Sequence, residues 1–301
     1  MQYRAPVEAY TGTVREVTIG AGSKVLKIGG ETALPFHFFD QGDIPNPPRL
    51  ALEVWDMPPK DWARWVIEPF QDVISDPVKW AVRSAKHGAD AVCLHLASAD
   101  PAAADTAPEA AAQTVKDVAE AIPVPLVVYG PDDENKSAAV LARVAEVCRG
   151  ENLLLGPAVK ENYEAIAKAA LDHGHCLIAQ TSLDINLAKE LNIKICKSFP
   201  PDRVVIDPVS SALGYGMEYS FSIMERIKQT GVIFKDNMTQ MPTIANLAGE
   251  CWKTKEAKED KTQGILWEGM TAVSLLLAGA NLAVLRHPET LRYVKKLFGL
   301  K

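Results

Sequence analysis

Short apolar runs rich in Val, Ile and Leu recur along the chain, and each is followed by a segment whose apolar residues repeat with a helical period. This alternation is typical of a parallel sheet whose strands are joined by crossover helices. The runs that predict strands lie at residues 49–56, 89–97, 124–130, 152–158, 175–182, 203–208, 241–247 and 281–287. The predicted helices lie at residues 77–87, 107–121, 136–148, 161–173, 184–191, 218–230, 264–278 and 288–298.

Eight strand–helix units in 301 residues predict an α/β fold, a (β/α)8 TIM barrel over residues 49–301. Ahead of it, residues 14–20 and 24–30 alternate between apolar and polar positions around Ala-Gly-Ser, which predicts an N-terminal β-hairpin. We expect residues 1–48 to form this hairpin and an ordered connection from residue 33 to 48, both packed on the barrel. The hairpin is expected to cover the bottom of the barrel.

Composition narrows the class of protein. With 48% apolar and 23% charged residues, the chain can bury a large core. Its net charge of -6 is spread without a basic stripe, which argues against nucleic acid as a partner. The N-terminus has no apolar signal segment, and the most apolar stretch, residues 265–279, is too short to cross a bilayer and contains Glu268. We therefore expect a cytoplasmic protein without a membrane partner.

The cysteines argue against a metal centre built by this chain alone. The sequence contains five of them, far apart and without a CxxC pair, so neither a zinc site nor an iron–sulfur cluster is predicted. An odd number also fits a reducing compartment better than a disulfide framework. The cysteines are Cys93, Cys148, Cys176, Cys196 and Cys251.

Functional side chains of such barrels lie at the carboxyl ends of the strands. None of the predicted strands carries an interior lysine for Schiff-base chemistry, and the loops after the last two strands lack a glycine-rich phosphate site. Aldolases and enzymes of phosphorylated substrates are thus disfavoured. The polar ring predicted at the mouth comprises Asp56, His95, Tyr129, Gly156, Thr181, Ser182, Asp207, Asn246, Arg286 and His287.

Several motifs allow both a structural and a functional interpretation. The string DHGHC (172–176) resembles a metal cluster, but it joins a helix to the start of a strand, which favours a structural role. His95 and His287 are better ligand candidates, although a histidine at a strand end is more often a satisfied polar residue. The charged segment 253–264 is either a solvated helical excursion or an element that docks a partner.

Two further segments at the predicted mouth stay open in the same way. Asp184 is expected to cap the helix that begins at Ile185, which leaves the Asn186 amide at the mouth, either bound to a ligand edge or in solvent. Tyr215 lies between Gly214 and Gly216, where the backbone can approach a flat ligand closely or simply turn.

Strings along nearly the whole chain, in one order, resemble the small (delta) subunit family of the corrinoid iron–sulfur protein of acetyl-CoA synthesis. The most specific is LGYGMEYSFSIMERI at residues 213–227. The others are ALPFHFF (33–39), EVWD (53–56), GENLLLG (150–156), LDIN (183–186), VVIDP (204–208), GILWEGMTA (264–272) and RHPE (286–289).

The resemblance implies a TIM barrel bound to a large corrinoid iron–sulfur subunit that carries the cluster and most of the corrinoid contacts. A cobamide between the two subunits would take a methyl group from a methyltetrahydrofolate (or methyltetrahydropterin) methyltransferase and deliver it to acetyl-CoA synthase. The cofactor would do the difficult chemistry, so no catalytic or metal-ligating residue is assigned to this chain. The residues that match family strings at the mouth, and are expected to face the corrinoid, are Asp56, Asn186, Asp207, Tyr215 and Arg286.

A rival interpretation is a stand-alone pterin-binding TIM-barrel methyltransferase, in which Asp184, Asn186 and Asp207 hydrogen-bond the pterin ring. The two classes share a fold, and fold alone does not separate them. Catalysis therefore stays open at this point, with a non-catalytic subunit favoured over an independent enzyme. A hydrolase or aldolase has the least support.

Overall fold

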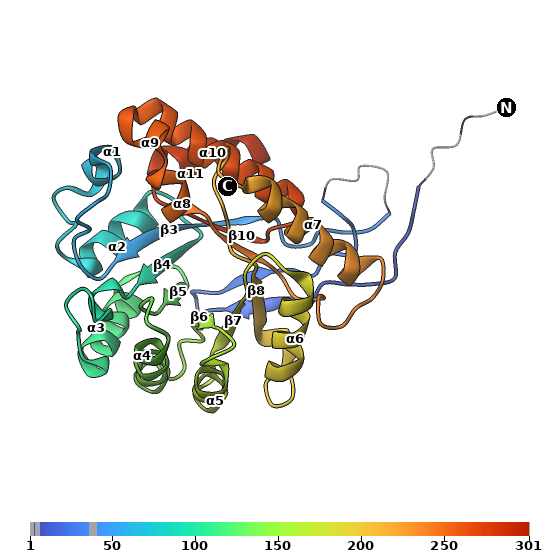
Figure 1. The fold of residues 1–301 in the computed structure, drawn as a ribbon, viewed down its shortest axis with the longest axis horizontal. Helices are drawn as coiled ribbons and strands as arrows, with labels where there is room; N and C mark the ends of the chain where they lie inside the picture. The colour runs from blue at the N-terminus through green and yellow to red at the C-terminus, as the bar shows by residue number, and fades with distance from the viewer. Residues whose placement is uncertain (1–2, 4–6, 36–40, 301) are drawn as a thin grey trace.

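The computed structural model describes residues 3, 7–35 and 41–300, and within them eight parallel strands form a nearly closed barrel (Figure 1). The strands pair in the order β8, β7, β6, β5, β4, β3, β10, β9. Ile206 bridges Thr243, and its N–H donates to the Pro242 carbonyl at 2.9 Å, which brings the two ends of the sheet together. The predicted (β/α)8 barrel is confirmed. Its strands are β3 (Arg49–Trp55), β4 (Ala91–His95), β5 (Leu126–Tyr129), β6 (Leu154–Ala158), β7 (Cys176–Gln180), β8 (Val204–Asp207), β9 (Ile244–Asn246) and β10 (Leu282–Leu285).

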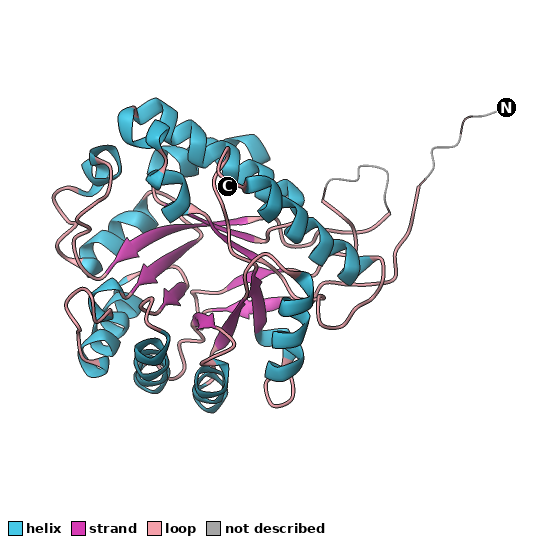
Figure 2. Ribbon diagram, viewed as in Figure 1, coloured by secondary structure: helices cyan, strands magenta, loops and turns pink. Residues whose placement is uncertain are grey.

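The helices form the outer layer around these strands (Figure 2). Each predicted helix is present, with ends displaced by a few residues at most. Side-chain caps explain several of the starts: Asp76 accepts the Lys79 N–H at the start of α2, and Asp133 accepts the Lys136 N–H at the start of α4. These helices are α2 (Pro77–Lys86), α3 (Pro108–Ala121), α4 (Glu134–Val147), α5 (Tyr163–His173), α6 (Ile185–Ile195), α7 (Met217–Val232), α10 (Lys261–Ala278) and α11 (Pro288–Phe298).

Short helices that the sequence pattern did not predict lie in the loops at the carboxyl ends of β3 and β9. They are α1 (Arg64–Ile67), α8 (Ala248–Lys253) and α9 (Lys255–Glu259), and three 3-10 turns occur at Glu68–Phe70, Ala97–Ala99 and Pro201–Arg203. Such elements are too short to show a helical period. Much of the charged segment 253–264 is therefore helical, and Thr254 caps α9 by accepting the Ala257 N–H.

The predicted N-terminal hairpin is confirmed as β1 (Val17–Ile19) paired antiparallel with β2 (Leu26–Ile28). Its apolar side chains form one buried cluster with the inward-facing residues of the barrel strands, among them Ala51 and Leu282 near the strand starts. Asn152 donates to the Thr18 carbonyl at 2.8 Å and so fastens the hairpin to the start of β6. The amino-terminal opening of the barrel is thereby filled.

The division into residues 1–48 and 49–301 stays a prediction, and residues 36–40 of the predicted connection lie outside the described residues. No helix among residues 3, 7–35 and 41–300 is both long and apolar enough to cross a membrane.

A buried ion pair joins the segment before the barrel to its outer layer. Lys228 of α7 donates to Glu31, and both side chains are almost completely buried. Asn281, just before β10, accepts from Lys228 at 3.0 Å and donates to Glu31 at 2.9 Å. Burial alone would raise the pKa of Glu31, but Lys228 and Asn281 outweigh it and hold the pKa below its ordinary value.

Replacing one member of this pair leaves a buried charge without a partner. We expect Lys228→Met to lower the free energy of unfolding by about 3 kcal/mol or more, measured by urea denaturation. The control is Lys168→Met, which removes an exposed pair with Asp172 and should cost less than about 1 kcal/mol. The double variant Lys228→Met/Glu31→Gln should recover part of the lost unfolding free energy. A loss equal to the sum of the losses in Lys228→Met and in Glu31→Gln alone would contradict the coupling.

Candidate functional site

The carboxyl ends of the strands surround a cavity of about 570 Å³. It lies above β3, β4, β9 and β10, where the loops that follow these strands rise as a rim. Aromatic and proline side chains dominate one wall, and acidic and basic side chains occur in nearly equal numbers around the cavity. The lining includes Glu53, Trp55, Trp62, His95, Glu250 and Arg286.

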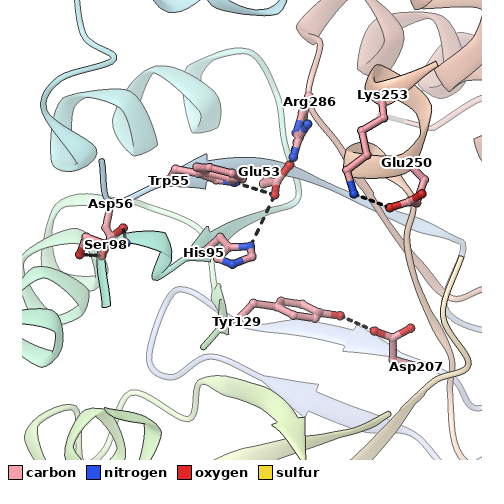
Figure 3. Close-up of polar contacts among 10 residues, drawn as sticks. All are labelled: Glu53, Trp55, Asp56, His95, Ser98, Tyr129, Asp207, Glu250, Lys253 and Arg286. Carbon is pink, nitrogen blue, oxygen red and sulfur yellow. Dashed lines mark hydrogen bonds and ion pairs between the residues drawn. The ribbon is translucent and has the colours of Figure 1, made fainter. Parts of the chain in front are cut away.

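Glu53 is the carboxylate around which the floor of this cavity is organised (Figure 3). It accepts hydrogen bonds from Arg286 Nε and, at 2.9 Å, from Trp55 Nε1, and His95 Nδ1 lies 3.9 Å from Oε1. Burial alone would raise the pKa of Glu53, but the Arg286 guanidinium, helped by His95 and Trp55, holds it below the ordinary value. Glu53 is therefore an anion in the protein, neutralised by Arg286.

The guanidinium of Arg286 lies over the ring of Trp62, 3.9 Å from its centroid. Trp62 in turn makes edge contacts with Trp55 (5.1 Å between centroids) and with Trp80 (5.7 Å). Trp80 belongs to α2 and is completely buried. This chain of contacts fixes the cavity wall to the core, so that Arg286 is held in one place.

The main chain at Arg286 is held from beneath by Glu268 of α10. Glu268 is completely buried and accepts the N–H of Arg286 at 2.6 Å and that of His287 at 3.3 Å. Burial raises the pKa of Glu268 to about 7, against these hydrogen bonds. The carboxyl thus holds the main chain directly after β10 in place.

Asp207, at the end of β8, lies inside the mouth and is completely buried (Figure 3). Its carboxylate accepts from Tyr129 Oη at 2.9 Å, from Gln180 Nε2 at 2.8 Å and from the Val209 N–H at 2.9 Å. Burial raises the pKa of Asp207 in spite of these donors. The hydrogen bonds that Asp207 accepts therefore come from the barrel itself.

The other predicted contact residues have different positions. Asp56 accepts from the Ser98 N–H at 2.8 Å and from its hydroxyl at 2.5 Å, on the far side of Trp55 from Arg286 (Figure 3). Asn186 is exposed in the first turn of α6, and Tyr215 is exposed with its hydroxyl donating to Glu256 at 3.0 Å. Of the five predicted contacts, Arg286 is the one that lines the cavity.

The histidine candidates separate clearly. His175 of the DHGHC string is buried between the Leu153 N–H (3.0 Å) and the Ala145 carbonyl (2.9 Å), as the structural interpretation predicts. His287 is buried and caps α11 by accepting the Glu289 N–H. His95 lines the cavity. Asp184 caps α6 through the N–H groups of Asn186 (2.7 Å) and Leu187 (3.1 Å), as expected.

Sequence reasoning missed Glu53, Trp62 and Glu268 as site residues. A signal existed for two of them, because Glu53 interrupts an apolar strand and Glu268 interrupts an apolar helix, and a charge at such a place requires a partner. Trp62 lies in a loop without periodicity. Over the part of the chain that the structure describes, no group of three His, Cys, Asp or Glu side chains is arranged to hold a metal ion.

Comparisons with known proteins agree with one another. Residues 16–294 match the family described as CO dehydrogenase/acetyl-CoA synthase delta subunit. The acetyl-CoA decarbonylase/synthase complex subunit delta of Methanosarcina mazei is 37% identical, over 97% of this chain and 72% of that protein. The corresponding subunit of Archaeoglobus fulgidus is 36% identical, over 97% of this chain and 69% of its own.

Among solved structures, similar folds occur in dihydropteroate synthases. The enzyme of Xanthomonas albilineans has a TM-score of 0.60 at 15% identity, with 84% of this chain and 92% of that chain covered. The enzyme of Vibrio fischeri also has a TM-score of 0.60, at 14% identity, with 86% and 94% covered. At these identities the likeness concerns the TIM-barrel fold.

The buried carboxyl of Glu268 should give the protein a pH-dependent stability. Since its pKa is higher in the folded protein (about 7 against 4.5), the folded state binds a proton that the unfolded state lacks between these values, and stability falls as pH rises through them. Glu268→Gln should remove this slope, so that the variant gains up to roughly 3 kcal/mol relative to the parent between pH 4.5 and 8.

Urea denaturation across this pH range checks the prediction. Glu120→Gln, which changes a carboxylate on the outer face of α3, serves as the control and should retain the parental profile. Parallel profiles for the parent and Glu268→Gln would show that the carboxyl does not titrate in this way.

The hydroxyl of Tyr129 should contribute to stability through Asp207. Tyr129→Phe removes one of the donors to a buried carboxylate and should cost about 1–2 kcal/mol of unfolding free energy. Tyr163→Phe, whose hydroxyl contacts Glu164 at the surface, should cost less than about 0.5 kcal/mol. Equal thermal midpoints for the two variants would speak against the bond to Asp207.

Proposed function

Because the chain belongs to the CO dehydrogenase/acetyl-CoA synthase delta subunit family, we propose that it is the small subunit of a corrinoid iron–sulfur methyl carrier. It caps a cobamide that takes a methyl group from methyltetrahydrofolate or a methyltetrahydropterin and delivers it to acetyl-CoA synthase, in the cytoplasmic reductive acetyl-CoA pathway. Its partners are the large corrinoid subunit, the methyltransferase and acetyl-CoA synthase.

The observation that carries this proposal is the state of the buried carboxylates at the mouth. Glu53, Asp207 and Glu268 accept hydrogen bonds from the protein's own groups. A general base or nucleophile needs a free reactive edge within reach of its substrate. The mouth is built to be rigid and to present a surface, which suits a lid better than a catalyst.

The size and chemistry of the cavity fit part of a macrocycle. A cavity of about 570 Å³ is of the size that encloses a drug-like ligand, and a cobamide is much larger, so a second protein must hold the remainder. The tryptophan wall offers apolar area to a flat ring system, and Arg286 offers donors to its polar edge. When bound, the cobamide supplies the cobalt that carries the methyl group; the barrel orients the ring and excludes water.

An iron–sulfur cluster does not fit this chain. Its five cysteines are free, and all but the half-buried Cys196 are buried. Burial raises the pKa of Cys148 to about 12 and that of Cys176 to about 11, which opposes the thiolate form that ligates iron. We therefore propose that the cluster belongs to the large subunit.

For the predicted contacts, we propose different roles. Arg286 contacts the corrinoid from within the cavity, whereas Asn186 and Tyr215, which are exposed, meet the corrinoid or the large subunit outside it. Asp56 and Asp207 act on the corrinoid face through the loops that they hold. Each role follows from where the side chain lies and from the groups with which it forms hydrogen bonds.

The rival, a stand-alone pterin methyltransferase, has less support from these contacts. It requires Asp184, Asn186 and Asp207 to hydrogen-bond the pterin ring. Asn186 is exposed, but Asp184 caps α6 and Asp207 is enclosed by Tyr129, Gln180 and Val209. Purified protein mixed with methyltetrahydrofolate and cob(I)alamin, without a partner, should show no methyl transfer. Turnover would favour the rival.

Co-expression with a large corrinoid subunit should give a tight, coloured heterodimer, and a colourless monomer would contradict the proposal. Two exposed aromatic residues that flank α7 provide a matched pair of variants: Tyr215 at its mouth end and Phe234 beyond its other end, 53% and 73% exposed. Tyr215→Ala should weaken the heterodimer about tenfold, as interface aromatics do, and Phe234→Ala should leave the dissociation constant within about twofold.

A further inference from the structure

Arg286 has donors that the protein does not use. Its Nε donates to Glu53 and its main-chain N–H to Glu268, whereas none of the hydrogen bonds within the described residues uses Nη1 or Nη2. Arg286 as a whole is nearly buried, with 6% of its surface exposed, but neither Nη atom is enclosed by protein. Since Arg286 lines the cavity, this edge of the guanidinium faces whatever the cavity receives. Gly249 lies beside Nη2: the Cβ of an alanine there would lie 3.4 Å from this atom, in van der Waals contact with it.

The charge of this donor edge is already compensated. Glu53 is 4% exposed, is bonded to Arg286 Nε and receives a second bond from Trp55. In a cavity of low dielectric constant, an ion pair so close acts on a third group as a dipole and not as a free cation. The Nη edge therefore donates hydrogen bonds without offering a net positive charge.

The rim of the cavity adds little field of its own. Glu250 and Lys253 form an ion pair at 2.8 Å on the rim (Figure 3), and the acidic and basic side chains of the lining nearly balance. A ligand with a charged group at Arg286 would lose its hydration without gaining an opposite charge. A neutral acceptor, such as the carbonyl of a primary amide, meets no such penalty.

We propose that Glu53 is the specificity-determining residue of the mouth cavity: by neutralising Arg286, it makes the site select a neutral amide over a carboxylate or phosphate. The inference rests on the proposed function, because a corrin ring carries primary amides around its edge. The cavity then receives an amide edge of the macrocycle, and the phosphate-bearing nucleotide tail lies away from this chain. Arg286 contacts the amide, and Glu53 is a positioning residue that acts through Arg286.

The test compares probes that differ in one group. The heterodimer with the large subunit is titrated with cobinamide, which has no nucleotide tail, and with each cobinamide isomer in which one peripheral amide is hydrolysed to a carboxylic acid. The absorbance of the bound corrinoid gives each dissociation constant. For the wild-type protein we expect at least one acid isomer to bind about tenfold or more weakly than the amide, as for a buried charge left without a partner.

Glu53→Gln removes the negative charge and almost keeps the shape of the side chain at residue 53. Arg286 is then a cation without an anionic partner. The ratio of amide to acid affinity should fall about tenfold or more for that isomer and can invert, because a carboxylate then meets an unpaired guanidinium. Glu250→Gln removes a carboxylate from the rim of the same cavity and should leave the ratio within about twofold. A merely structural role for Glu53 would weaken both probes equally and leave the ratio unchanged.

The outcomes are distinguishable. A wild-type heterodimer that holds neither probe would overturn the proposed function and this inference with it. A heterodimer that holds cobinamide but gives the same ratio for the parent and Glu53→Gln would overturn the inference alone. Should Glu53→Gln fail to fold, as judged by near-ultraviolet circular dichroism, Arg286→Gln carries the test: its affinity for cobinamide must fall about tenfold, and an unchanged affinity would overturn the inference.

Discussion

The carboxylate of Glu53 is tolerated inside the barrel because a guanidinium and an indole meet it there. Without them an ionised group at this depth would cost several kcal/mol. The pair in turn requires a rigid frame, since a displaced guanidinium would leave both charges buried and alone. The Trp62 ring on one side and Glu268 beneath the main chain supply that frame. Much of the mouth can thus be understood as the surroundings that a single buried anion demands.

The architecture was accessible from the sequence, and the site was so only in part. Parallel strands that are buried on both faces have continuous apolar runs in the sequence, and each run predicted from residue 49 onward is a barrel strand in the structure. Glu53 and Arg286, in contrast, are 233 positions apart, and nothing in the pattern of either strand names the other as its partner. A charge within an apolar run signals that a partner exists, without saying where.

The direction of a side chain was equally hidden from sequence reasoning. Asp56 and Asp207 both lie at the end of a predicted strand, so the sequence pattern predicts both side chains at the mouth. In the structure Asp56 holds the loop at Ser98, and Asp207 is enclosed by Tyr129 and Gln180. Which donors reach a carboxylate first depends on loop geometry that has no period. Short loop helices such as α8 and α9, which carry part of the rim, are missed for the same reason.

The Glu31–Lys228–Asn281 contact has a consequence for synthesis of the chain. Glu31 leaves the ribosome early, its cationic partner follows 197 residues later, and Asn281 follows after 250. Until then the carboxylate has to remain hydrated, since burying it alone is costly. The segment around Glu31 therefore cannot take its final position while the chain is still being synthesised. Its docking coincides with completion of the cylinder, which couples the first-made segment to the last.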